Sequence, residues 1–138
     1  MAEWAAAKLT PGTYSFHVRL GQPRGTPPGT FASAEERALL ISTLPEADLV
    51  RRVDGGAEIV EFIVWRPQET IGQILYYRPL LPLTPGYEDL IVEQVALRIV
   101  TGLGDPRVAD FARGLGMAVE VFRPAWLEQA LARRRGGS

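Results

Sequence analysis

The stretch 58-EIVEFIVWRPQETIGQILYYRPLL-81 changes its pattern from strand to helix. Residues 57 to 65, AEIVEFIVW, are rich in β-branched and aromatic side chains and are largely apolar on both faces, which predicts a central strand. The strand pattern stops before Pro67, and residues 69 to 78, ETIGQILYYR, are predicted to form a helix. Glu61 puts a charge in the middle of this strand, and that charge needs an explanation.

Glu61 is expected to lie on a strand face with apolar neighbours, because side chains two residues apart point to the same side. Those neighbours are Ala57, Ile59, Ile63 and Trp65. A carboxylate buried among them costs free energy unless it is paired or binds a cation. The sequence therefore predicts a partner for Glu61 on a neighbouring element.

A β-hairpin offers such partners. Residues 48 to 56, DLVRRVDGG, predict its first arm and a strong turn sequence. If the two glycines form a two-residue turn, Val50 lies opposite Glu61. Asp48 and Arg52 are then its diagonal neighbours on the same face.

The helix after the strand adds two polar residues. Gln73 and Tyr77 are four residues apart, so they share one face of that helix. If the helix packs over the hairpin, both polar groups can approach Glu61. Asp48, Glu61 and the carbonyl of Phe62 could then supply hard oxygen ligands for Mg²⁺.

Structural alternatives stay open for these residues. In one of them Glu61 pairs with Arg52 or hydrogen-bonds Gln73, while Tyr77 packs with its hydroxyl at the edge. The single histidine, His17, lies on the polar side of a predicted strand. A solvent-facing or hydrogen-bonded histidine is the default there, rather than a zinc ligand.

The rest of the chain alternates strands and helices. Residues 13 to 20 predict a half-buried strand, and Ser33 begins a helix with a capping box. Residues 95 to 102 and 117 to 122 predict two strands around a helix that Asp105 caps, with the length of a right-handed parallel crossover. With a last helix at the C-terminus, this order predicts an α/β fold, a three-layer sandwich with a mixed sheet.

Composition narrows the classes of function. The 138 residues favour one domain, and the net charge of −1 provides no global basic field for nucleic acid. There is no cysteine for a disulfide framework or a thiolate metal site, and no apolar run long enough for a membrane helix. The N-terminus lacks a secretory pattern. We expect protein partners and no membrane, in an intracellular protein or in a virion assembled in the cytoplasm.

These features together resemble the PD-(D/E)XK nuclease superfamily, in its RecB-like branch. Asp48 lies where the family's hairpin carries an aspartate, and residues 61 to 63, EFI, lie where it carries Glu-x-Lys. Gln73 and Tyr77 match the Gln-x-x-x-Tyr motif of the helix that follows. The resemblance implies a restriction-endonuclease-like core.

The resemblance also implies a division of the chain. Residues 31 to 123 would form the nuclease-like α/β core. Residues 1 to 30 would be an N-terminal arm, an edge strand and a Pro/Gly loop, and residues 124 to 138 a C-terminal helix and basic tail. Trp4 is expected either to dock on another subunit or to belong to a short helix that covers its own sheet.

Ile63 departs from the family pattern. The lysine that it replaces helps to activate the attacking water and stabilises the charge that develops on phosphate. An isoleucine does neither, and degenerate copies in this superfamily resemble parts that hold assemblies together. We therefore predict a non-catalytic structural or assembly protein without a cofactor, in a homo-oligomer or in a larger particle such as a phage neck or tail.

Two other functions stay open. One is a Mg²⁺-dependent DNA nuclease with Asp48 and Glu61 as metal ligands and catalytic groups, supported by Gln73 and Tyr77. The other is non-cutting contact with nucleic acid or a partner through arginines, namely Arg51, Arg52, Arg66, Arg133, Arg134 and Arg135. For the last three, a solvated helix end near the negative end of the helix dipole is a simpler explanation.

Overall fold

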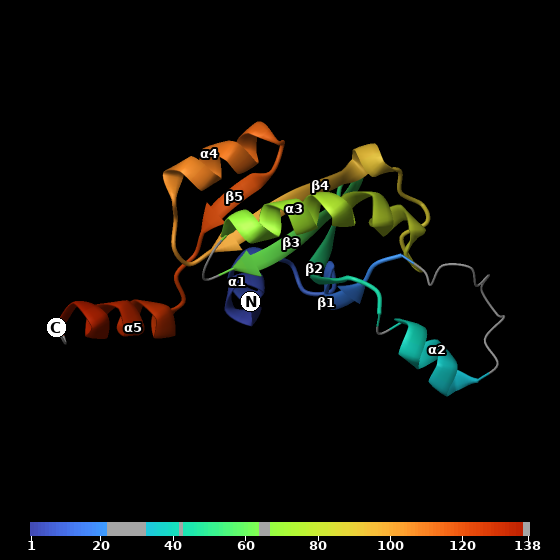
Figure 1. Ribbon diagram of the computed structural model, residues 1–138, viewed down its shortest axis with the longest axis horizontal. Helices are drawn as coiled ribbons and strands as arrows, with labels where there is room; N and C mark the ends of the chain where they lie inside the picture. Colours follow the sequence, from blue (N-terminus) through green and yellow to red (C-terminus); the bar gives the residue numbers. More distant parts are fainter. Residues whose placement is uncertain (22–32, 42, 64–66, 137–138) are drawn as a thin grey trace.

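A computed structural model describes residues 1–21, 33–41, 43–63 and 67–136 of the chain (Figure 1). Within these residues one sheet has the strand order β1-β2-β3-β4-β5. Its strands are β1 (Tyr14–Arg19), β2 (Glu46–Val53), β3 (Gly56–Ile63), β4 (Val95–Thr101) and β5 (Ala118–Val121). β2 runs antiparallel to both β1 and β3, whereas β3, β4 and β5 run parallel to one another. The predicted α/β fold with a mixed sheet is therefore confirmed.

Helices lie on both faces of this sheet. The described helices are α1 (Ala2–Lys8), α2 (Ala34–Ile41), α3 (Pro67–Tyr77), α4 (Pro106–Gly114) and α5 (Ala125–Gly136), with 3₁₀ turns η1 (Arg78–Leu83) and η2 (Val92–Gln94). Figure 1 shows α3 and α4 over one face, while α1 packs on the other and α5 extends away from the sheet. None of the described helices has the length and apolar character needed to span a membrane.

β3 is buried on both faces, as its apolar pattern predicts. Ile59 packs in a core cluster with residues of α3 and α4, such as Ile74 and Ala112. Val60, the next residue, packs in a second cluster with Trp4 of α1. The core therefore consists of two layers with β3 between them, because successive side chains of a strand point to opposite faces.

The predicted Asp105 cap is present, as is the Ser33 side-chain bond of the predicted capping box. The Ser33 Oγ accepts a hydrogen bond of 3.1 Å from the backbone N–H of Glu36 at the start of α2. The Asp105 carboxylate accepts one of 2.9 Å from the N–H of Arg107 at the start of α4. Each side chain satisfies a backbone donor that has no partner within its own helix.

The hairpin register differs from the expected one by two residues. The turn residues are Asp54 and Gly55, so Val53 pairs with Gly56 and Val50 with Ile59. Gly55 has the positive φ, +75°. Gly56 is a strand residue whose added Cβ would lie 2.1 Å from the carbonyl oxygen of Gln94, a distance that no side chain tolerates. The second glycine therefore serves close packing and not the turn.

Trp4 belongs to a helix that covers its own sheet, which was one of the two expectations. Its side chain is 2% exposed. The indole packs edge-to-face on Phe62 with ring centroids 5.3 Å apart, and its Nε1 donates a hydrogen bond to the Glu120 carboxylate. Trp4 therefore anchors α1 to β3 and β5 and is not available as a docking arm.

β1 does not keep a single face along its length. Tyr14 packs against the cluster under α1, whereas Val18 packs against the cluster under α3 and α4. The break falls at His17, whose φ is +53°. Positive φ is uncommon for a residue with a side chain, and here it reorients the second half of the strand.

Candidate functional site

Asp48 and Glu61 lie on neighbouring strands, and each binds the backbone beside the other. Leu49 pairs with Val60, and Asp48 and Glu61 are the next residues of the two strands. The N–H of Asp48 donates a hydrogen bond of 3.0 Å to Glu61 Oε1, and the N–H of Phe62 donates one of 2.8 Å to Asp48 Oδ2. The carboxyl groups are therefore direct neighbours, not the diagonal pair that was expected.

The environment of this pair favours a protonated Glu61. The side chain is 8% exposed, and burial together with the nearby charge of Asp48 raises the pKa of Glu61 from 4.5 to about 8. A hydrogen bond between the two carboxyl groups acts in the same direction. These effects favour the protonated form of Glu61, which explains how the strand accommodates a carboxyl group in its apolar run.

Tyr77 is the residue of α3 that lies close enough to respond to the pair. It is half-buried, and its pKa is raised by burial and by the charges of Glu61, Asp48 and Glu46. Gln73 on the same helix is exposed and is not a hydrogen-bond partner of Glu61 in the described part of the chain. Tyr77 therefore approaches Glu61, as expected, whereas Gln73 does not.

Arg52 does not pair with Glu61, so this structural alternative is wrong. Its guanidinium binds Asp89 at 2.9 and 3.1 Å, donates to the Gly86 carbonyl and stacks over Tyr87 at 4.7 Å from the ring centroid. The shifted register is the reason, because it places Arg52 opposite Ala57. Arg52 fastens the loop after η1 to the hairpin.

The other arginines are not gathered around the pair. Arg51 binds Glu58 at 2.9 Å, on the face opposite to Glu61. The three C-terminal arginines, Arg133, Arg134 and Arg135, lie in the last turn of α5, which extends away from the sheet (Figure 1). Arg66 lies outside the described residues, as does Trp65. The position of the C-terminal arginines agrees with the expected helix end near the negative dipole.

Ile63, two residues after Glu61, contacts the core cluster of α3 and α4 and is partly buried. It brings no charged or proton-transferring group to the pair. Among the described residues, no group of three or more histidine, cysteine, aspartate or glutamate side chains is arranged to hold a metal ion. Two carboxylates with waters nevertheless suffice in kind and number for Mg²⁺, so Asp48 and Glu61 would be its ligands.

His17 lies close to this region but outside the pair. Its Nδ1 lies 2.7 Å from Glu46 Oε1, and Glu46 also binds Arg19 at 3.0 Å. The histidine is 59% exposed, in agreement with a solvent-facing, hydrogen-bonded residue. The Glu46 cluster was not foreseen, because it depends on the pairing of β1 with β2 across 27 residues of the sequence.

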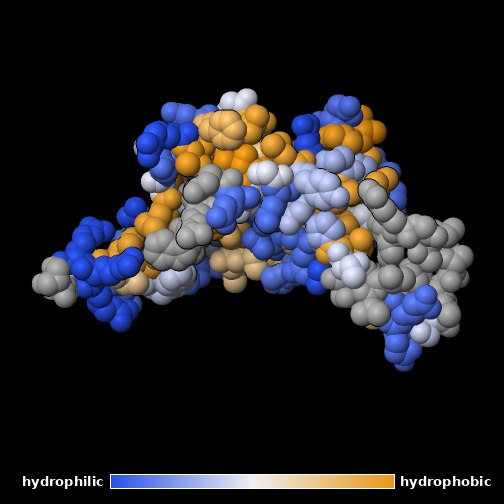
Figure 2. Space-filling model, in the orientation of Figure 1, coloured by the Kyte–Doolittle hydropathy of each residue, from blue (hydrophilic) through white to orange (hydrophobic). Residues whose placement is uncertain are grey.

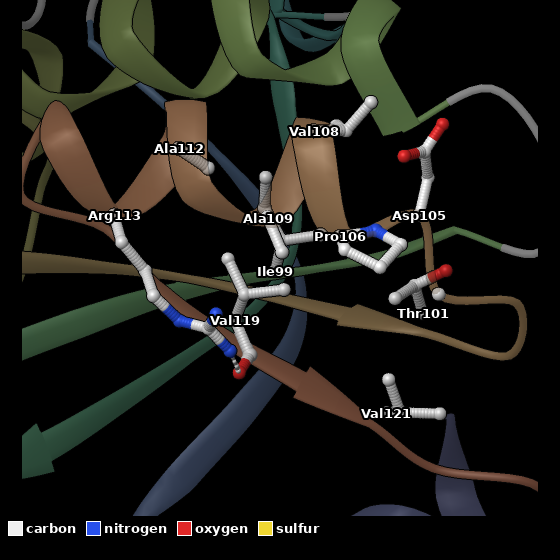
Figure 3. Close-up of a pocket in the computed structure, with 11 residues that line it drawn as sticks. Ile99, Thr101, Asp105, Pro106, Val108, Ala109, Ala112, Arg113, Val119 and Val121 are labelled. Carbon is white, nitrogen blue, oxygen red and sulfur yellow. Dashed lines mark hydrogen bonds between the residues drawn. The ribbon is translucent and has the colours of Figure 1, made fainter.

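A concave site lies between α4 and β5, and the sequence patterns did not indicate it (Figure 3). It is a cavity of about 270 Å³, lined mainly by apolar side chains, including Ile99, Val108, Ala109, Ala112, Val119 and Val121. The sequence feature that could have indicated this cavity is the presence of small residues, Ala109 and Ala112, on the face of α4 that lines it. Alanines there leave room that larger side chains would fill.

Comparison with known proteins identifies no relative. No protein-family model, curated protein or solved structure matches the chain.

Proposed function

We propose that the protein is a non-catalytic module with a restriction-endonuclease-like core that acts as a structural or assembly component. The observation that carries this proposal is the Asp48–Glu61 pair. Each carboxyl group accepts a backbone N–H of the opposite strand, so both hold the β2–β3 hairpin together. Ile63 stands where the superfamily has its lysine, and it packs into the core.

The order of the elements supports the nuclease-like core. Three antiparallel strands are followed by α3 and then by the parallel strand β4. Asp48 lies on the second strand, Glu61 on the third and Tyr77 on the helix, which is the order that the family motif requires. This agreement concerns topology and the positions of three residues, and it does not extend to the lysine.

The electrostatics support a structural use of the pair. Burial and Asp48 raise the pKa of Glu61 to about 8, so the pair is accommodated by a protonated Glu61 without any cation. The only lysine of the chain, Lys8, lies in the last turn of α1, the helix on the other face of the sheet. In the described part of the chain, no cationic side chain replaces the missing lysine beside Glu61.

The surface supports a role in assembly. Several large apolar side chains are exposed, among them Tyr76, Leu83, Ile91, Phe111, Val121 and Trp126. Figure 2 shows apolar atoms gathered at the surface over α4. Exposed apolar groups that cluster in this way favour protein contacts. The partners would be further copies of the chain or other proteins of a larger particle, of which a phage neck or tail is one example.

The test combines metal binding with cleavage. Mg²⁺ and Mn²⁺ are titrated into wild type, Glu61→Gln and the control Glu93→Gln by calorimetry, and each protein is incubated with single- and double-stranded DNA. Glu93 is exposed on η2 and serves as a matched loss of one carboxylate. The proposal expects no binding and no cleavage in all three proteins. Binding and cleavage by wild type that Glu61→Gln abolishes would overturn it.

The Asp48–Glu61 pair also favours a second candidate, a Mg²⁺-dependent DNA nuclease. A buried acidic group with a strongly raised pKa, as Glu61 is, is common at functional sites. Asp48 and Glu61 would hold the ion, which would supply charge stabilisation at the phosphate, and Tyr77 would border the site. The same titration separates the two candidates, since only this one predicts metal-dependent cleavage.

A further inference from the structure

α5 projects from the body of the protein and presents an exposed face (Figure 1). The helix is attached near its start, where Leu127, 3% exposed, packs against Gly102. Trp126 and Arg133 share another face of it, because seven residues make about two helical turns. Trp126 is 54% exposed, and Arg133 is exposed and pairs with no carboxylate of the described chain. This face therefore carries an aromatic ring and a positive charge about 10 Å apart along the helix.

A surface of complementary character lies around η2 and the tip of the β2–β3 hairpin. Leu83 and Ile91 remain 59% and 58% exposed there, and Val53 is 39% exposed. Asp54 and Glu88 are exposed as well, and neither pairs with a cation within the residues that the structure describes. Figure 2 shows apolar atoms flanked by hydrophilic ones over η2, at the upper right. These five residues, which we call the η2 surface, combine apolar side chains with negative charge.

Contacts between the hairpin and the turns order the η2 surface. Gly56 of the hairpin packs against the backbone carbonyl of Gln94 in η2. Arg52 of β2 binds the Asp89 carboxylate at 2.9 Å and donates to the Gly86 carbonyl. A surface that is ordered in advance loses little conformational entropy when a partner binds.

α5 and the η2 surface lie at opposite ends of β4. η2 leads directly into Val95, the first residue of β4, whereas Gly102, against which Leu127 packs, follows the last one. The seven residues of β4 separate these ends by about 23 Å. α5 has 12 residues, or a length of about 18 Å, and points away from the sheet (Figure 1). It therefore cannot reach the η2 surface of its own chain, but it can reach that of a second copy.

We propose that α5 of one copy binds the η2 surface of the next, so that copies assemble head to tail. Trp126 then covers Leu83 and Ile91, and Arg133 meets the negative charges of the η2 surface. The two sides of this contact differ, so it is heterologous and either closes into a ring or continues as a filament. The inference rests on the proposed assembly function, and it names a second copy as the partner.

The main test reverses the charge on each side of the contact. Arg133→Glu changes the α5 side, and the double variant Asp54→Arg/Glu88→Arg changes the η2 side. All three side chains are exposed, so the fold tolerates the changes. Self-association of the full chain is measured by sedimentation velocity over a concentration series. We expect wild type to associate and either variant to raise the dissociation constant about tenfold or more.

Arg135→Glu is the matched control for the α5 side. Arg135 lies in the same last turn as Arg133 and is also exposed. Two residues are about 200° apart around a helix, so its side chain points away from the face of Trp126. The control should keep the wild-type dissociation constant within about threefold. Equal losses for Arg133→Glu and Arg135→Glu would contradict the assigned face.

Mixing the two charge-reversed proteins separates contacts between copies from effects within one copy. Arg133→Glu presents a negative α5 to a negative η2 surface, whereas the double variant presents a positive α5 to a positive one. In an equimolar mixture, every contact between unlike proteins joins opposite charges. Association should therefore recover to within a few-fold of wild type. An effect within one chain cannot be repaired by mixing, so failure to recover would overturn the proposed contact.

Ile91→Asp tests the apolar part of the contact independently. The hydrogen bonds between Ile91 and Gln94 use the backbone of Ile91, so they do not depend on its side chain. The variant should abolish association while its circular dichroism spectrum stays that of wild type. A monomeric wild type, or association that all of these variants leave unchanged, would overturn the inference.

Two further outcomes distinguish this contact from other functions. If wild type stayed monomeric and bound DNA, and Arg133→Glu abolished that binding, this face of α5 would serve nucleic acid and the inference would be wrong. Metal-dependent cleavage by a protein that still associates through α5 would instead overturn the proposed function and leave the contact standing.

Discussion

Glu58 and Glu61 lie three residues apart on β3, and both are buried, at 6% and 8% exposed. Glu58 accepts hydrogen bonds from Arg51 and Arg98, at 2.9 and 3.0 Å, on the face under α1. Glu61 faces another carboxyl group, that of Asp48, on the face under α3. One strand thus shows two ways to bury a carboxyl group: pairing with cations and retention of a proton.

The two glutamates also differ in how far their contacts reach. Arg98 continues from Glu58 to Glu120 at 3.3 Å, and Glu120 accepts the hydrogen bond from Trp4. This network connects β3, β4, β5 and α1. The Asp48–Glu61 pair joins only β2 and β3. The Glu58 network therefore fixes the tertiary structure, whereas the Glu61 pair fixes one hairpin.

The largest predicted effect follows from breaking the cation-paired site. Glu58→Gln removes the charge that two partly buried arginines share, and those arginines keep their desolvation cost. We expect the free energy of unfolding to fall by about 3 kcal/mol, measured by urea denaturation at pH 7. Glu93→Gln, at an exposed position, is the matched control and should change it by less than about 0.5 kcal/mol. A loss for Glu58→Gln no larger than the control's would show that the network does not stabilise the fold.

Replacement of Glu61 by glutamine should raise the free energy of unfolding at high pH, whereas the same replacement of Glu58 lowers it. The pKa of Glu61 is about 8 in the folded chain, against an ordinary value of 4.5. Between these two pH values the folded state keeps a proton that the unfolded state loses, so wild-type stability declines as pH rises from about 4.5 to about 8. Below that window the contribution is fully present, and above it the loss is complete.

Glu61→Gln removes this titration but keeps an oxygen that accepts the N–H of Asp48. At pH 9 the variant should be more stable than wild type by on the order of 2 kcal/mol, with a smaller difference at pH 5. Urea denaturation across this pH range, with Glu93→Gln beside it, measures the effect. If the free energy of unfolding of wild type instead rose between pH 4.5 and about 8, the folded state would not keep a proton on Glu61.

The smallest predicted effect tests the far end of the Glu58 network. Trp4→Phe keeps an aromatic ring against Phe62 but deletes the N–H that binds Glu120. We expect a loss of about 1 kcal/mol in the free energy of unfolding. The additional loss should shrink in a Glu58→Gln background if the network acts as a unit. Strictly additive losses would show that Trp4 and Glu58 act independently.

Much of the fold could be predicted from local patterns. The apolar run of β3, the Ser33 and Asp105 caps and the length of the β4-α4-β5 step each identified an element or its connection. These signals depend on neighbours a few residues apart. They can therefore be recognised in the sequence without knowledge of tertiary contacts.

The details of the site could not be predicted in the same way. The register depended on Gly56, which is needed where the chain approaches Gln94, 38 residues later. Arg52 found its partner in Asp89, and Trp4 found one in Glu120. Contacts between residues far apart in the sequence do not change the local hydrophobic pattern, so that pattern cannot predict them. The groove under α4 was missed for a related reason, since alanines in a helix predict helix and do not reveal the space above them.

In the proposed function, Asp48 and Glu61 form a protonated structural pair and not a metal site. The most direct measurement is the carboxyl ¹³C chemical shift of Glu61, titrated with pH in the absence and presence of excess Mg²⁺. For a structural pair, we expect a midpoint at about 8 under both conditions. A midpoint that Mg²⁺ lowers by more than about one unit would contradict it, because a bound cation favours the ionised carboxylate.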